Sequence, residues 1–260
     1  VYLHEEVVPL FADLRDTFSM QRSDITVSLE KAQMEPAVIF IEESAEIHVR
    51  VESGAKASVI CICRGASLPV HVMQSGEVAA GATLHWINIT LGDGITQSLQ
   101  STCIGEGGVS TIDWIFRASD HEKQTLSAKN IFSGARGGGE ITMKGVAEGK
   151  AHVKASGMIE IGEKGAGTHT YLSQHVLMLD PTAKVDAIPG LEIRTNDVKA
   201  SHSATVSRVT PEDLFYFESR GIAELEARRM YIDGFLGELL SRIADPKARA
   251  RAEEALQMHP

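Results

Sequence analysis

Apolar and polar residues alternate with a period of two from residue 36 to about residue 209, and this pattern limits the possible folds more than any other feature. The alternation predicts β-strands over residues 38–41, 46–51, 57–62, 83–89, 110–116, 140–146, 151–155, 158–161, 168–172, 175–179, 184–187, 191–193 and 204–206. The stretch has no helical pattern of ten residues, so the sequence excludes alternating strands and helices of the Rossmann type.

Small residues precede several of these strands at regular intervals. Gly54, Gly81 and Gly108 each stand before a strand, 27 positions apart. Later corners follow one another faster, at Gly149, Gly165, Thr182 and Asp197. Repeated units of a corner and a strand are typical of a β-solenoid, and an aromatic content of 5% suits a narrow coil. The alternation fits a β-sandwich as well, so the pattern leaves the two architectures open.

The period changes at Thr210, which divides the chain into a β body and a helical tail. Thr210 and the following Pro-Glu-Asp predict a capped helix that ends at Gly221. Further helices are expected over residues 223–243 and 247–258. We therefore expect an N-terminal segment (1–35), a β core (36–209) and a C-terminal helical domain (210–260). Within the first segment, residues 6–14 suggest a short helix and residues 25–29 a strand.

Composition excludes several classes of function. The 260 residues contain 25 Lys and Arg against 35 Asp and Glu, and the net charge of −10 argues against a nucleic-acid partner. No apolar run is long enough to span a membrane, and the first residues do not resemble a secretory signal. Three cysteines do not form a disulfide framework and favour a cytoplasmic protein. Cys61 and Cys63 are interpreted as small buried residues on one face of a strand.

Catalytic motifs are weak in this sequence. It contains no phosphate-binding loop, no HExxH and no GxSxG. Stacked strands could bring two of His152, His169 and His175 together as metal ligands, but their spacing matches no specific site. The favoured interpretation is that they are ordinary surface or core histidines. A β-helical enzyme that acts on a polysaccharide or another small molecule stays an alternative, but two tryptophans and scattered acids do not favour it.

One segment has a more specific order of residues. Pro-x-Leu-Glu-Ile at residues 189–193 is followed by NDVKASHSATV, then by LFYFESRGI in the capped helix, and then by EARRM. In this order the segment resembles the SufB/SufD family, subunits of the SUF machinery that assembles iron–sulfur clusters. The resemblance implies a right-handed parallel β-helix with a small helical domain, which decides between solenoid and sandwich. It also implies a non-enzymatic scaffold whose partner, a SufC-type ABC ATPase, hydrolyses ATP.

The resemblance assigns roles to particular residues. His202 falls on a histidine associated with iron or cluster binding, so it is the candidate metal ligand. The cysteine of SufB-type subunits falls near Ala183, and Ser201 and Ser203 stand where SufB-type subunits have acids, so the chain is similar to a short SufD-type form. We expect no stably bound cofactor, and at most a transient iron ion or cluster at a subunit interface. The expected partner is a second copy or a SufB-type subunit, besides the ATPase. The expected partner-binding residues are Leu191, Glu192, Ile193, His202, Phe215, Tyr216 and Arg220.

Overall fold

The computed structural model describes residues 24–29, 36–65 and 69–258, and in this part strands precede three helices. The strands form two seven-stranded sheets. Sheet A contains β1 (Asp24–Leu29), β3 (Ala45–Val51), β5 (Val70–Val78), β7 (Ile95–Cys103), β9 (Lys123–Phe132), β11 (His152–Ile161) and β13 (Lys184–Ile193). Sheet B contains β2 (Ala37–Ile41), β4 (Lys56–Gly65), β6 (Thr83–Gly92), β8 (Val109–Ala118), β10 (Gly138–Ala147), β12 (Thr168–Met178) and β14 (Val198–Arg208). The suggested helix at residues 6–14 lies outside the described residues.

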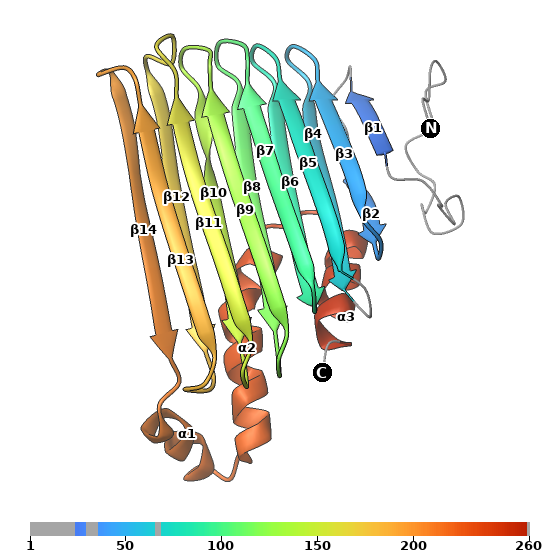
Figure 1. Cartoon of the computed structure of the whole chain (residues 1–260), viewed down its shortest axis with the longest axis vertical. Helices are drawn as coiled ribbons and strands as arrows, with labels where there is room; N and C mark the ends of the chain where they lie inside the picture. The colour runs from blue at the N-terminus through green and yellow to red at the C-terminus, as the bar shows by residue number, and fades with distance from the viewer. Residues whose placement is uncertain (1–23, 30–35, 66–68, 259–260) are drawn as a thin grey trace.

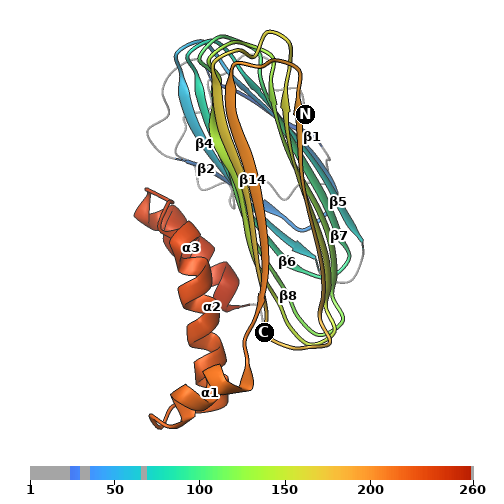
Figure 2. The same ribbon diagram turned by 90° about the vertical axis from the view of Figure 1, so that its left-hand side faces the viewer.

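The chain passes from one sheet to the other with every strand, and each strand pairs in parallel with the strand two places on (Figure 1). Val59 pairs with Trp86 and Trp86 pairs with Ile112, so one coil takes 27 and then 26 residues here. Figure 2 shows the two sheets as the opposite walls of one coil. This arrangement confirms the parallel β-helix and excludes the sandwich of antiparallel hairpins.

The corner spacing now has a geometric explanation. Gly54 and Gly81 lie in turns that lead from sheet A to sheet B, and both have positive φ, at +72° and +65°. Their interval of 27 residues is a full coil. Gly149 and Gly165 lie in successive turns on opposite sides of β11, so their shorter interval is half a coil.

Three strands of sheet A, β5, β7 and β9, are absent from the sequence prediction because polar residues occupy one or two inward positions in each. In the lumen between the sheets, the Gln74 and Asn88 amides donate to one another at 3.0 and 2.8 Å. Gln97 donates to Gln74 at 2.9 Å, and Thr90 donates to Gln97 at 2.7 Å. These mutual hydrogen bonds let polar side chains occupy a buried face that the alternation rule assigns to apolar ones.

The sequence pattern also broke β11, β12 and β13 into two pieces each, which was wrong. Gly157 interrupts the pattern in β11, yet the strand continues through it. The position is glycine because a Cβ there would lie 2.6 Å from a methyl carbon of Leu172. Pro189 interrupts β13, which is the outermost strand of sheet A, where a missing N–H is tolerated.

An apolar core fills the lumen, with Trp86, Trp114 and Phe116 fully buried. The tail consists of α1 (Pro211–Glu218), α2 (Glu224–Leu240) and α3 (Pro246–Gln257). Thr210 and Asp213 form the expected capping box of α1. Helices α2 and α3 lie against the outer face of sheet B, as Figure 2 shows. A second apolar cluster joins these two helices to that face. Among the described residues, no helix is long and apolar enough to cross a bilayer.

Candidate functional site

Strands β13 and β14 form the last coil of the solenoid, and we call residues 184–208 the terminal coil. Within the described structure no further strand pairs with the outer edge of either one. No residue of β13 or β14 is buried, whereas β11 and β12 beneath them are mostly buried on their inward face. The terminal coil therefore exposes both the end of the lumen and two strand edges.

His202 faces the lumen at this open end. It pairs in register with Leu172, which is fully buried in the lumen core. Its neighbours on the same side of β14, Val198 and Ala200, pack against that core. The side chain of His202 is nevertheless exposed, because the described structure places no coil above it. An imidazole in this position is accessible from outside the chain and can bind a metal ion or a partner.

The other residues expected to bind a partner in β13 divide between the two faces of sheet A. Leu191 faces the lumen and packs on the core, and Ile193, on the same face, is 41% exposed. Glu192 faces outward, where it accepts a hydrogen bond from Arg194 at 2.9 Å. The structure therefore does not bring Glu192 and His202 together.

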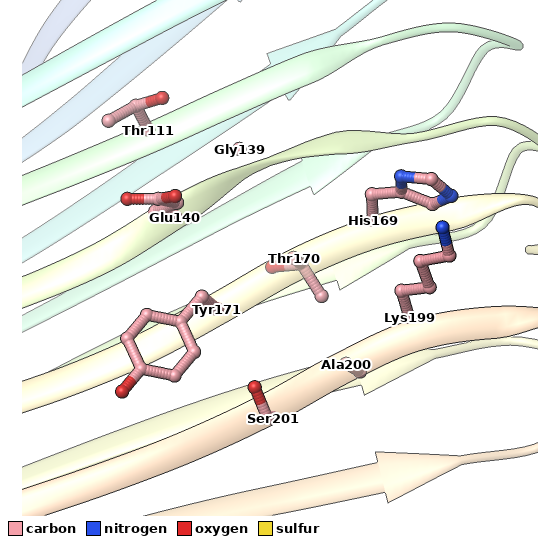
Figure 3. Close-up of a pocket in the computed structure, with 9 residues that line it drawn as sticks. All are labelled: Thr111, Gly139, Glu140, His169, Thr170, Tyr171, Lys199, Ala200 and Ser201. Carbon is pink, nitrogen blue, oxygen red and sulfur yellow. The ribbon is translucent and has the colours of Figure 1, made fainter.

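A shallow hollow of about 630 Å³ lies on sheet B beside the terminal coil. Figure 3 shows the side chains of His169 and Lys199 next to each other at one end, with Glu140 and Tyr171 further along. The Tyr171 hydroxyl donates to Ser203 at 2.6 Å and so links β12 to β14. The sequence analysis did not identify this hollow, although its polar residues recur at alternate positions of β12 and β14.

The three histidines considered as metal ligands do not meet. His152 belongs to sheet A and contacts Asp186 at 3.1 Å, whereas His169 and His175 belong to sheet B. No group of three His, Cys, Asp or Glu side chains in the described part of the chain is arranged to hold a metal ion. His152 thus lies in the opposite sheet from the other two, and His169 and His175 are six residues apart on one strand, β12.

The cysteines lie far from the terminal coil. Cys61 and Cys63 are in β4 and Cys103 is in β7, all three as free, buried thiols. Burial raises the pKa of each thiol to about 12, so they stay protonated and are poor ligands. Ala183 is buried just before the terminal coil. Residues 184–208 contain no cysteine, so the terminal coil has no thiolate to hold a cluster.

The expected ATPase-binding residues come together at the start of the tail. The Phe215 and Tyr216 residues of α1 are 67% and 58% exposed. The Arg220 guanidinium lies over the Tyr216 ring at 5.4 Å, while Phe217 turns inward against Tyr231. This corner is an aromatic surface with a cation beside it, which is the composition of many protein-binding hot spots.

Ionic contacts fix the tail to the β body, and the sequence analysis missed them. Asp113 of β8 is almost fully buried beneath the tail and accepts hydrogen bonds at 2.8 Å from Arg242, after α2, and at 2.8 Å from His85. Lys144 of β10 pairs with Glu238 of α2 at 2.5 Å and lies 4.9 Å from the Phe235 ring centre. The sequence signal was an acid, Asp113, between apolar residues of a strand.

The parallel strands of this chain stack into one coil, and a helical tail packs on one of its two sheets. This architecture places the chain in the class of β-helix proteins. Residues 22–235 match the family described as "SUF system FeS cluster assembly, SufBD core domain". The chain belongs to the SufB/SufD family.

Two mycobacterial relatives show the extent of the similarity. An iron–sulfur cluster assembly SufBD family protein of Mycobacterium leprae is 30% identical over 221 residues, which cover 80% of this chain and 55% of the relative. A protein of the same description from Mycobacterium tuberculosis is 29% identical over 219 residues, with the same coverage. The chain thus spans about half the length of these relatives.

Proposed function

We propose that this chain is a non-catalytic scaffold subunit of a SufBCD-type complex that assembles iron–sulfur clusters. It pairs through its terminal coil with a second copy or a SufB-type subunit, and its tail binds a SufC-type ABC ATPase that hydrolyses ATP. Its free, buried thiols agree with a reducing compartment such as the cytoplasm. Besides family membership, one observation carries the proposal: in the described part of the chain the terminal coil is open, with an exposed apolar lumen edge and two unpaired strand edges.

Strand β14 is the better of the two edges for pairing. It contains no proline along Val198–Arg208, so every residue has a backbone N–H group, whereas Pro189 removes one from β13. An apolar side chain lies at each end of the lumen edge, Ile193 at one end and Val206 at the other. These side chains are 41% and 44% exposed. A partner that continues the sheet would cover these side chains and pair the free backbone groups.

The test replaces Ile193 and Val206 together by serine. Fully burying such a side chain contributes about 1.5–3 kcal/mol, so covering the exposed fraction contributes about 0.6–1.3 kcal/mol each. Two chains in a symmetric dimer would lose about 2.5–5 kcal/mol, which weakens association at least about 50-fold. Analytical ultracentrifugation of the chain alone, and with a SufB-type partner, measures this. Met73→Ser, on the outer face of sheet A and 52% exposed, is the control. Unchanged association in the double variant would remove the terminal coil as the pairing surface.

The same proposal assigns iron binding to His202, with iron or a cluster as cargo rather than as a resident cofactor. The support is an exposed imidazole at the open lumen, where a partner's terminal coil would supply further ligands. Anaerobic incubation with iron and sulfide should leave less iron on His202→Ala than on the parent. Equal iron on both proteins would exclude this residue.

A further inference from the structure

The hollow on the outer face of sheet B lies where β10 begins with glycines, so this strand contributes few side chains to it. One row of outward positions crosses successive strands here, with Val109, Gly138, His169 and Lys199 in register. A Cβ at Gly138 would meet only Val109 and His169, at 3.7 and 3.9 Å, so a side chain would fit. Its absence helps to leave a space of about 630 Å³, a size that is typical of small-ligand sites.

The two ends of this hollow carry opposite charges. Figure 3 shows Lys199 next to His169 at one end and Glu140 further along. Glu140 and Lys199 are exposed, and within the described part of the chain neither forms an ion pair. Nearby charged residues are paired, for example Arg117 of β8 with Glu148 at 2.8 Å. The hollow therefore offers both a cation and an anion to a ligand.

The register fixes the separation of the charged ends. Glu140 pairs with Tyr171, and His169 lies two residues before Tyr171 on β12. Two residues along a strand span about 6.6 Å, and neighbouring strands lie about 4.8 Å apart. The α-carbons of Glu140 and His169 are therefore about 8 Å apart, and those of Glu140 and Lys199 about 12 Å. The Tyr171 ring, which is 36% exposed, supplies an apolar surface in the same hollow.

We propose that the hollow binds a small zwitterionic molecule, with its carboxylate or phosphate group on Lys199 and His169 and its ammonium group on Glu140. A lysine offers three donors and an imidazole at least one in either protonation state, whereas an ionised carboxylate only accepts. An anion alone would meet the like charge of Glu140, and a cation alone would meet that of Lys199, so the site favours a molecule that carries both charges. Such binding requires neither iron nor the pairing edges of the terminal coil.

The experiment titrates the full chain with 6-aminohexanoate, which carries a carboxylate and an ammonium group at the two ends of a flexible chain. Hexanoate and hexylammonium each keep one of these charges. The NMR signals of the His169 imidazole, assigned with His169→Gln, report binding. The zwitterion should bind at least about threefold more tightly than either single ion, as one exposed charge contact at each end allows. A parallel titration with 5-aminopentyl phosphate distinguishes the two anions, and a preference of either zwitterion over the single ions supports the proposal.

Two substitutions test the two ends separately. In Glu140→Gln the zwitterion should bind no more tightly than hexanoate, and in Lys199→Met it should bind no more tightly than hexylammonium. Lys154→Met is the matched control, because Lys154 is an exposed lysine on the outer face of sheet A. Gly138→Leu should abolish binding, since its side chain would occupy the hollow.

Three results would overturn the proposal: the chain binds none of these probes, hexanoate binds as tightly as 6-aminohexanoate, or Lys199→Met has no more effect than Lys154→Met. Circular dichroism checks that each variant folds. Should Gly138→Leu not fold, the two charge variants decide, because Glu140 and Lys199 are exposed and lie outside the core.

Discussion

The contact between Asp113 and Arg242 supports a quantitative prediction about how the tail is held on the β body. Asp113 is 1% exposed, whereas the side chains of Arg242 and His85 are 36% and 25% exposed. Replacing Arg242 by Met leaves a buried carboxylate with His85 as its remaining hydrogen-bond partner. Breaking a fully buried pair costs about 3–5 kcal/mol, and the bond that His85 keeps reduces this to about 2–4 kcal/mol.

Removing the carboxylate of Asp113 should reduce the free energy of unfolding less than removing the guanidinium of Arg242. Asp113→Asn leaves the charge on Arg242, which can turn towards water because a third of its side chain is already exposed. We expect a loss of about 1–2 kcal/mol in the free energy of unfolding. The double variant should lose less than the sum of the single losses, with a coupling of about 1–2 kcal/mol.

Urea denaturation of the full chain measures these free energies, and hydrogen exchange in α2 and α3 shows whether the tail loosens first. Arg50→Met is the control, since Arg50 and Glu52 are 56% and 40% exposed and their 2.9 Å contact should contribute under about 1 kcal/mol. The reasoning is refuted if Asp113→Asn is the more damaging single change, or if the two losses simply add.

Three further predictions concern the tail, the lumen and the thiols. The double variant Phe215→Ala, Tyr216→Ala should bind the cognate ABC ATPase at least about tenfold more weakly in a pull-down, with unchanged stability. The control Met73→Ala should bind as the unchanged chain does. Equal capture by the double variant, the control and the unchanged chain would contradict the docking surface. Gly145→Ala places a methyl group in the space of the Phe116 ring, so the free energy of unfolding should fall by about 1–3 kcal/mol, and an unchanged urea midpoint would disagree with this packing. The buried cysteines should not react with a thiol reagent at pH 8 until the chain unfolds. Folding raises their pKa from 9.0 to about 12, so the free energy of unfolding should be constant below about pH 9 and fall as the pH rises towards 12. Urea titrations at pH 8 and pH 10 test this difference.

The alternation of side chains predicted most strands of sheet B, although it broke β12 into two pieces and found only residues 204–206 of β14. The capping pattern at Thr210 predicted the change to helices. Apolar positions with a period of two and a capped helix start are local patterns, and local patterns can be read from sequence. The same reading omitted β5, β7 and β9, because Gln74 and Gln97 become acceptable inside the lumen only when strands from the other sheet supply their partners.

The candidate site was also predictable from the sequence only in part. The order of residues around His202 pointed to the terminal coil and to the family, and the exposed aromatic residues of α1 were expected from the sequence. Only the tertiary structure shows that His202 faces the lumen while Glu192 faces outward, since the register with β12 and β11 decides which side of each strand meets the core. The partners of Asp113 and the hollow on sheet B depend on contacts between segments that are far apart in the chain. Hydrophobic periodicity and helix capping depend on residues that are neighbours in the sequence. Which side of a strand meets the core, and whether a buried polar atom finds a hydrogen-bond partner, depend on the coils stacked against that strand.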